Sequence, residues 1–483
     1  MAIDIVTLKT QGSQAYIDTS IKVGDINIYQ FMSMAESGGG HFRDGYFLAQ
    51  YKRELDYISR RQQAYYRNFV KPIVRAMVEP VFSDVELGQV VDVNDEQVFD
   101  TKGNAFIENV DRAGNDFQVI TEDAVKLGRL HGVSFAVVEN VPVDMMPESD
   151  REAIKQRAFP YVYIKEAWEV FADETKLDNA GNLEYITFID EPVKDRHGMQ
   201  ERWRKWTRTY SVLIKRGRFG RYEEIPETRI DHNLGIVPVV VTYSEAKANR
   251  KKVLADPPLY DLAKTNYTIF NKDSEIREVE RAQGFSFFYA QGVDGASVES
   301  GVNNYFNVPF QATLAPNYAS PDAAIPKELR ESGEQIRMSL FQIAEQNGVT
   351  GVQNQQSGIA KEWDFFAHES VLQRTAAMAE KFQDSVMDIF NLYLSGDDDY
   401  FYSIEYKDSY SPLNEMVELE KIEKYIDLSP AAKGAAMARF KAFQLLFPNA
   451  TDEEIEEVQT AEEMAQVSPT ETGGKIDIDN PEF

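Results

Sequence analysis

The chain has 483 residues, of which 79 are acidic and 51 basic, and its formal net charge is −28. It contains no cysteine, which excludes disulfides, thiolate metal sites and a cysteine nucleophile. The excess of acidic residues argues against a protein that binds nucleic acid over its whole surface, because phosphate binding depends on Lys and Arg. With 43% hydrophobic residues the chain can build sizeable cores, and its length predicts about three domains.

The N-terminal half predicts helices followed by a β-rich region. Apolar residues recur at helical spacing between residues 45 and 82, where Pro72 marks a kink or a junction between two helices. One helix is predicted from about Asn104 to Gly128, where glycine breaks it before a strand at 133–140. From residue 159 to 243 short apolar runs alternate with turn residues. They predict an antiparallel sheet, with one strand running from Trp206 to Ile214.

The second half predicts two helices around a compact β-like excursion. An apolar stripe that also includes Asn266 and Asp273 predicts a helix from Pro258 to about Ala282. The aromatic stretch 284–326 predicts short strands with turns. Next come a helix at 327–346, a polar loop at 348–357, a long helix at 358–394, a strand at 400–406 and further helices. The predicted fold class is α+β.

Motifs of enzymes, membrane spans and metal sites are not found. The sequence has no GxxxxGK[ST] phosphate loop, no GxSxG elbow and no HExxH pair. Met1–Thr10 lacks the features of a signal peptide, and no run of about 18 apolar residues occurs, so we expect an intracellular protein. Asp397–Asp399 could bind a cation, but a solvated loop is more typical of such a run. We expect no enzymatic activity and no cofactor.

Five segments resemble, in order, landmarks of the portal proteins of tailed bacteriophages. They are similar to the early wing helix, the helix–glycine–strand step, the Asn–Gly–Pro entry to the stem, the first stem helix and the start of the long helix. The segments are Tyr66–Val74, Leu127–Val138, Asn233–Pro238, Pro258–Asn266 and Ser357–Lys361.

The resemblance implies a portal-type subunit with a mixed α/β wing, a two-helix stem, a small β-containing clip and a helical crown. The implied boundaries are wing 1–255, stem helix 256–283, clip 284–326, stem helix 327–347, channel loop 348–357, wing 358–410, and crown with acidic tail 411–483.

The function that this resemblance implies is a homododecameric ring at one capsid vertex of the virion. Double-stranded DNA would pass through it, independently of sequence, during genome packaging and ejection. The implied partners are the terminase large subunit, the head–tail adaptor or tail proteins, the major capsid protein and the scaffolding protein, with assembly in the host cytoplasm and no membrane contact.

Particular residues acquire roles on this template. Flexible or polar uncharged residues suit a channel loop, namely Gly348, Gly351, Asn354, Gln355, Gln356 and Ser357. Lys327, Arg330 and Arg337 could form basic rings in the channel, or ion pairs between subunits instead. Aromatic residues of the clip would pack between subunits or within one chain: Phe285, Phe287, Phe288, Tyr289, Tyr305, Phe306 and Phe310.

Two other functions remain open at this point. One is a soluble α+β enzyme with a metal bound by Asp397–Asp399. The other is a different virion structural protein, such as an adaptor or a scaffold.

Overall fold

A computed structural model divides the chain into two compact units, Met1–Asp408 and Ser409–Phe483. The structure describes residues 26–51, 54, 56–83, 85, 87–92, 97–98, 101–141, 150–195, 198–217, 221–245, 252–283, 287–291, 305–308, 317–319, 324–346, 358–394, 400–407, 410, 422–424, 439–443 and 458. In this part of the chain, helices and strands together confirm the α+β class, and no helix is long and apolar enough to cross a membrane.

The described part of the first unit begins with helices α2 (Ile28–Ser37), α3 (Tyr57–Gln63) and α4 (Val70–Phe82). Asn27 begins α2 because its side chain accepts the Tyr29 amide, and a capping box with Gln30 satisfies a second free donor. The predicted junction near Pro72 is confirmed, since α3 ends at Gln63 and Pro72 lies in the first turn of α4. A proline is tolerated there because first-turn amides have no partner within the helix.

The single helix predicted from Asn104 to Gly128 is wrong, because two helices occupy this region. Helix α5 (Lys102–Glu108) is capped by Thr101, and α6 (Phe117–His131) by the side chain of Asp116. Helix α6 also passes through Gly128 and ends at His131, followed by Gly132, whose φ of +81° suits a glycine. The apolar periodicity is nearly continuous from α5 to α6, so it does not reveal that there are two helices. The cap residues Thr101 and Asp116 mark where each helix begins.

Strand β2 (Val133–Glu139) lies between β10 (Val239–Tyr243) and β3 (Tyr161–Lys165), and both pairings are antiparallel. Strand β1 (Gln89–Val91) pairs with β14 (Phe401–Ser403), which confirms the strand expected near residue 400. Helix α7 (Asp150–Gln156) precedes β3.

A second antiparallel sheet has the order β4-β5-β6-β7-β8, with β9 paired to β7. The continuous strand predicted from Trp206 to Ile214 is wrong, because the chain turns at Arg208–Thr209 between β6 and β7. The Thr207 hydroxyl closes this turn by donating to the Tyr210 carbonyl at 2.7 Å. The strands are β4 (Lys176–Leu177), β5 (Leu183–Asp195), β6 (Gly198–Thr207), β7 (Tyr210–Arg216), β8 (Tyr222–Glu224) and β9 (Ile230–Asp231). The short 3₁₀ helices are η3 (Ala167–Glu169), η4 (Ala172–Glu174) and η6 (Pro226–Thr228).

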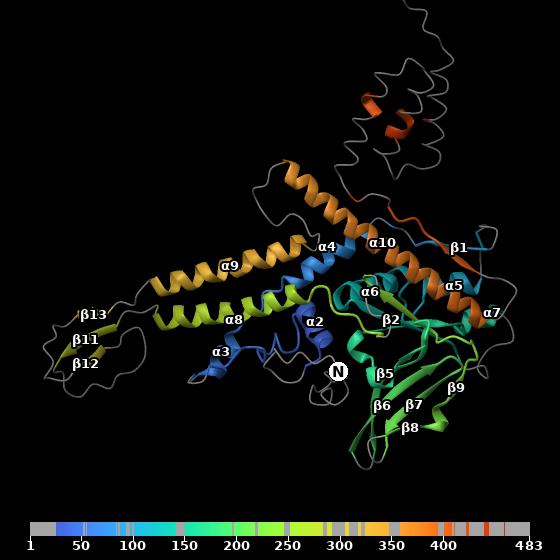
Figure 1. The fold of residues 1–483 in the computed structure, drawn as a ribbon, viewed down its shortest axis with the longest axis horizontal. Helices are drawn as coiled ribbons and strands as arrows, with labels where there is room; N and C mark the ends of the chain where they lie inside the picture. Colours follow the sequence, from blue (N-terminus) through green and yellow to red (C-terminus); the bar gives the residue numbers. More distant parts are fainter. Residues whose placement is uncertain are drawn as a thin grey trace, which may run out of the picture. The chain divides into compact units, whose positions relative to one another are not determined.

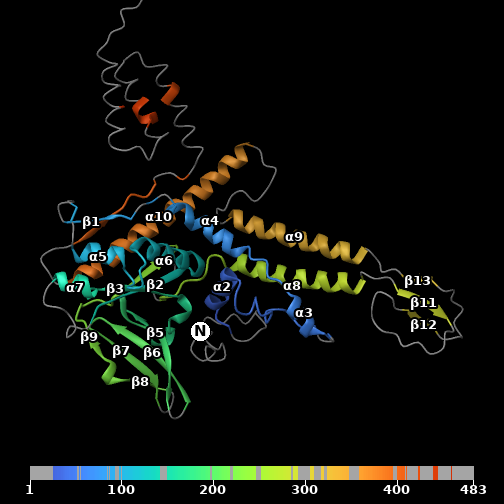
Figure 2. The same ribbon diagram turned by 180° about the vertical axis from the view of Figure 1, so that it is seen from behind.

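Helices α8 (Tyr260–Gln283) and α9 (Ala324–Gln346) run side by side, with a small sheet between them in the sequence (Figures 1 and 2). In that sheet β11 (Phe287–Gln291) pairs with β12 (Tyr305–Val308) in parallel and with β13 (Asn317–Ala319) antiparallel. Helix α9 begins three residues earlier than predicted, and Pro326 fits its first turn. Helix α10 (Gly358–Leu394) has the predicted bounds.

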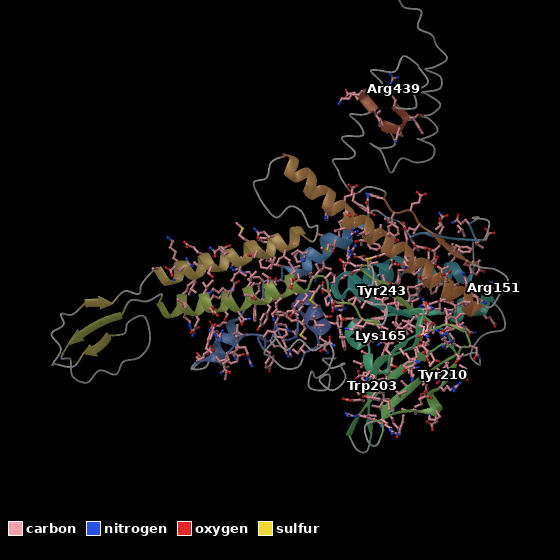
Figure 3. All side chains as sticks on the ribbon, in the orientation of Figure 1. Arg151, Lys165, Trp203, Tyr210, Tyr243 and Arg439 are labelled. Atoms are coloured by element: carbon pink, nitrogen blue, oxygen red, sulfur yellow. The ribbon has the colours of Figure 1, made fainter. Side chains whose placement is uncertain are left out.

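A large part of the described core of the first unit lies on the two faces of the sheet β10-β2-β3. Alternate residues of β2 point to opposite faces, as the pleat requires. Ala136 and Val138 pack with Phe382 and Phe390 of α10, while Phe135 and Val137 pack with Phe188 and Trp206 of the second sheet. Figure 3 shows Trp203 and Tyr210 on that second sheet.

In the second unit the described residues are helical at 422–424, at 439–443 and at residue 458. The helices predicted beyond residue 412 otherwise lie outside the described residues.

Candidate functional site

The aromatic residues assigned to the clip fall on two paired strands. Phe287, Phe288 and Tyr289 lie in β11, and Tyr305 and Phe306 lie in β12, with Phe288 opposite Tyr305 and Tyr289 opposite Phe306. The strands therefore pair within one chain. Packing of these rings between subunits and packing within one chain both stay predictions.

Part of the predicted site falls outside the described residues. This applies to Phe285 and Phe310 of the clip and to the whole channel loop, with Gly348, Gly351, Asn354, Gln355, Gln356 and Ser357. It applies equally to Asp397–Asp399, the alternative metal site. Their assigned roles remain predictions.

The three basic residues predicted for the channel all lie on α9 and all have acidic neighbours in the same chain. The Arg330 Nε atom lies 2.7 Å from Glu280 on α8, and Lys327 Nζ lies 3.9 Å from Glu331. Arg337 bonds Asp273 of α8 at 2.7 Å and also pairs with Glu334. Lys327 and Arg330 are 77% and 65% exposed, whereas Arg337 is 18% exposed. Lys327 and Arg330 present charge to the surroundings, and Arg330 and Arg337 each pair with a carboxylate of α8.

Asp273 is the centre of the contact between α8 and α9. Its side chain is 8% exposed and also forms an ion pair with Arg67, whose Nε lies 3.3 Å away. Nearby, a Cβ atom at Gly333 would lie 3.2 Å from the Cδ1 atom of Ile276, so the two helices approach closely there. A buried carboxylate is stable only when cations or hydrogen bonds compensate its lost hydration, and two guanidinium groups do so here.

Helix α8 is also covered on a second side, by the segment before α4. The Asn271 carboxamide accepts the Ala49 amide at 2.7 Å and donates to the Phe47 carbonyl at 3.3 Å. Asn266, fully buried, accepts the Phe69 amide at 2.9 Å. The sequence pattern gave no role to these asparagines. The polar residues Asn266 and Asp273 do interrupt an otherwise apolar stripe, and this interruption could have indicated a buried polar contact.

A polar cluster that the sequence did not reveal lies where α2, α6 and η3 meet. The Ser33 hydroxyl donates to Glu166 at 2.5 Å and lies 3.0 Å from the Nε2 atom of His131. The Trp168 indole donates to the same carboxylate at 2.9 Å. Burial lowers the pKa of His131 to about 3 and raises the pKa of Glu166. Because the imidazole is fully buried and neutral, the cluster suits a structural role better than proton transfer to a substrate.

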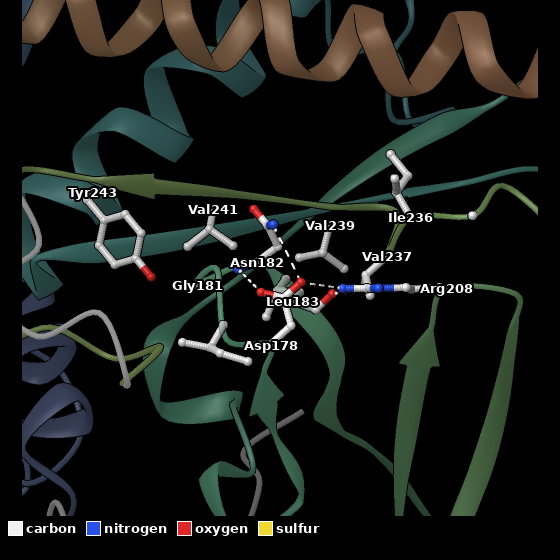
Figure 4. A pocket seen from close by; sticks show the side chains of 12 residues that line it. Asp178, Gly181, Asn182, Leu183, Arg208, Ile236, Val237, Val239, Val241 and Tyr243 are labelled. Carbon is white, nitrogen blue, oxygen red and sulfur yellow. Dashed lines mark hydrogen bonds and ion pairs between the residues drawn. The ribbon is translucent and has the colours of Figure 1, made fainter.

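A cavity of about 550 Å³ lies between β10 and the turn that joins β4 to β5 (Figure 4). Val237, Val239 and Val241 line its apolar part, and the ion pair of Asp178 with Arg208, at 2.7 Å, lies at its polar part. In the described residues, no group of three or more acidic or histidine side chains could hold a metal ion.

Comparisons with known proteins give distant structural neighbours. No protein-family model and no curated protein matches the chain. The neck of a native gene transfer agent (GTA) particle computed with C12 symmetry is 12% identical, with a TM-score of 0.37 over 77% of this chain and 90% of that one. The neck of the empty GTA particle computed with C6 symmetry is 13% identical, with a TM-score of 0.38 over 79% and 93%.

A third neighbour is the virion of the native GTA particle, 10% identical, with a TM-score of 0.34 over 85% of this chain and 98% of that one. These TM-scores are too low to identify a shared fold. The function must therefore be inferred from the features of the chain itself.

Proposed function

We propose that the chain is a virion structural protein and, more specifically, a portal subunit whose ring conducts double-stranded DNA through one capsid vertex. The observation that carries this proposal is the order of elements from α8 to α10. A helix leaves the body, a small sheet follows, and a second helix returns beside the first before a helix of 37 residues begins. This order agrees with the stem, clip, stem and long wing helix that the sequence resemblance implies.

The helix pair suits a spacer in an assembly. Arg330 and Arg337 join α9 to α8 through Glu280 and Asp273, so the ion pairs extend over two helical turns. Paired helices joined at several points would hold the sheet β12-β11-β13 at a fixed distance from the body. A clip needs this property if other proteins dock on it.

The charges also suit a conduit. The exposed side of α9 carries Lys327 and Arg330 together with Glu331 and Glu334, so neither sign dominates. A wall that held phosphates with many unpaired cations would slow the passage of DNA, because counterion release gives strong binding. A chain with a net charge of −28 would let DNA pass with little adhesion.

We extend the proposal to the partners and the absence of catalysis. The ring would be a homododecamer without enzymatic activity, and a terminase would supply ATP hydrolysis. The adaptor or tail proteins would bind the clip, and the capsid and scaffolding proteins would bind the wing and stem. The location would be the virion, after assembly in the host cytoplasm.

The mass of the purified particle tests this function. A dodecamer of 55.0 kDa chains has a mass of about 660 kDa, which mass photometry resolves from smaller species. Negative-stain images should show a central channel wide enough for duplex DNA. Monomers and dimers alone, across a range of salt and protein concentrations, would overturn the proposal. A ring without such a channel would favour an adaptor or scaffold.

A second measurement addresses the enzyme alternative. Tight, stoichiometric metal binding that is lost when Asp397–Asp399 are replaced by asparagine would favour a metal-dependent enzyme.

A variant lacking Asn354–Ser357 addresses the channel loop. The portal proposal predicts that this variant still forms rings but packages or retains DNA poorly, whereas failure to form rings would assign the loop a structural role.

A further inference from the structure

Strand β10 is an edge strand whose outer side meets no other strand in the described part of the chain. The Val138 amide donates to Pro238 at 3.0 Å and the Ser244 amide to Gly132 at 3.1 Å. Hydrogen-bonded pairs alternate along an antiparallel ladder, so Val240 also faces β2 with its backbone groups, while Val241 faces outward. The outer edge therefore offers at least the amide and carbonyl of Val241 to a further strand.

Two cavities flank this edge, one on each face of the sheet. The cavity of about 550 Å³ in Figure 4 meets the side chains of Val239 and Val241. A second cavity, of about 840 Å³, lies between β10 and α10 and meets Val240 and Thr242. A strand added to the edge would point alternate side chains toward the two cavities. This combination of free main-chain groups and alternating pockets is how proteins bind extended peptides.

The second cavity is basic, in a chain with a net charge of −28. Arg374 and Lys381 of α10 line it and are exposed, and no carboxylate in the described residues lies within ion-pair distance of either. Arg129 of α6, 8% exposed, bonds the neutral Thr375 hydroxyl at 2.8 Å and the Val371 carbonyl at 3.0 Å on the same helix α10. Burial, reinforced by the charge of Arg374, lowers the pKa of Arg129 to about 10. Glu245 lines the same cavity and offsets part of this positive charge.

We propose that the outer edge of β10 binds an extended acidic segment of another protein. Its backbone pairs with Val241, its apolar side chains enter the cavity beside Val239, and its carboxylates meet Arg374 and Lys381. A second copy of this chain is a poorer occupant, because pairing β10 with β10 would bring these cations together. The proposal does not depend on a ring, since the edge, the cavities and the cations belong to one chain.

Fluorescence anisotropy with the full chain tests the proposal. The probe is a labelled, acetylated hexapeptide of alternating aspartate and valine. A second peptide carries N-methyl groups on alternate amides, which removes main-chain pairing and leaves the charges. We expect the N-methylated peptide to bind at least about tenfold more weakly, because it loses ladder hydrogen bonds. Equal affinities, or no binding of the first peptide, would overturn the proposal.

Charge reversal tests the basic cavity separately. The double variant Arg374→Glu with Lys381→Glu should weaken binding at least about tenfold. The matched control is Arg43→Glu with Arg216→Glu, which reverses two exposed cations away from the edge and should bind as the original chain does. Equal weakening by both double variants would show a nonspecific charge effect and overturn the proposal.

Two further results would identify a different occupant. Displacement of the peptide by a single-stranded oligonucleotide at lower concentration than by unlabelled peptide would make this a nucleic-acid site. Self-association in analytical ultracentrifugation that the unlabelled peptide reverses would make a second copy the occupant. Either result overturns the proposal. If a variant unfolds, the comparison of the two peptides on the unmodified chain still tests the proposal.

Discussion

Two polar clusters among the described residues of the first unit differ in charge and in exposure. Between α8 and α9 the cluster is ionic, with Asp273 held by Arg67 and Arg337. Between α2, α6 and η3 the cluster contains a neutral imidazole, that of His131, beside Ser33 and Glu166. The ionic cluster joins α8 to α9, whereas the second cluster is built around the fully buried, neutral His131. We therefore expect the first to respond to charge removal, and the second to respond to pH.

The largest effect should follow from removing the central carboxylate of the ionic cluster. Asp273→Ala leaves Arg337, 18% exposed, without its partner on α8, and removing one member of a buried pair costs about 3 kcal/mol. Urea denaturation should show this loss in the free energy of unfolding. The control is Glu331→Gln on the exposed side of the partner helix α9, for which we expect less than about 0.5 kcal/mol. Equal losses for the two variants would mean that the ionic cluster does not join the helices.

The next effect concerns the response of His131 to acid. In the unfolded chain it takes up a proton as the pH falls through about 6.5, but in the folded protein its pKa is about 3. Its contribution to stability is therefore present above pH 6.5 and decreases as the pH falls, by about 2 kcal/mol at pH 5. Glu166 acts with the opposite sign, because its raised pKa favours the protonated acid in the fold, so the net loss is smaller.

Thermal unfolding between pH 7 and pH 5 measures this response. His131→Gln keeps a polar group near Ser33 but removes the titration, so its stability should fall less over the same range. Parallel curves for the variant and the original chain would contradict the assignment of the neutral imidazole.

A smaller effect is expected at the exposed end of the helix pair. Arg330 is 65% exposed and pairs with Glu280, so Arg330→Gln should cost about 0.5 kcal/mol at low salt. The cost should disappear near 1 M salt, where screening acts over about 3 Å. Denaturation of both proteins at two salt concentrations checks this. A cost that is independent of salt would indicate a packing role for the Arg330 side chain.

The smallest effect on folding is expected for Lys327, which is 77% exposed and lies 3.9 Å from Glu331. Lys327→Gln should change the free energy of unfolding by less than about 0.3 kcal/mol. Under the proposed function, any consequence should appear instead in DNA packaging by assembled particles, measured as packaged genome length. A large loss of stability would show that this lysine supports the fold.

Two loops with nearly the same sequence show that a local pattern can predict a local structure. Asp111-Arg-Ala-Gly-Asn115 and Asp178-Asn-Ala-Gly-Asn182 share four of five residues and adopt the same hydrogen bonds. In each, the aspartate accepts the amides two and four residues later, at 2.8 and 3.1 Å in the first loop and at 2.9 Å for both in the second. Gly114 and Gly181 have φ values of +104° and +94°, which favour glycine. The first loop separates α5 from α6, so this local pattern could have corrected the single predicted helix.

By itself the sequence determined the α+β class, the long helix α10 and the helix pair around short strands, because these depend on periodicity within one segment. The tertiary structure alone decided that Asp273 joins Arg67 and Arg337, and that His131 meets Ser33 and Glu166. Residues far apart in the chain make these contacts, and sequence spacing carries no information about them. It also decided that β10 is an edge with a basic cavity beside it, since the outer side of a strand depends on which strands pair with it.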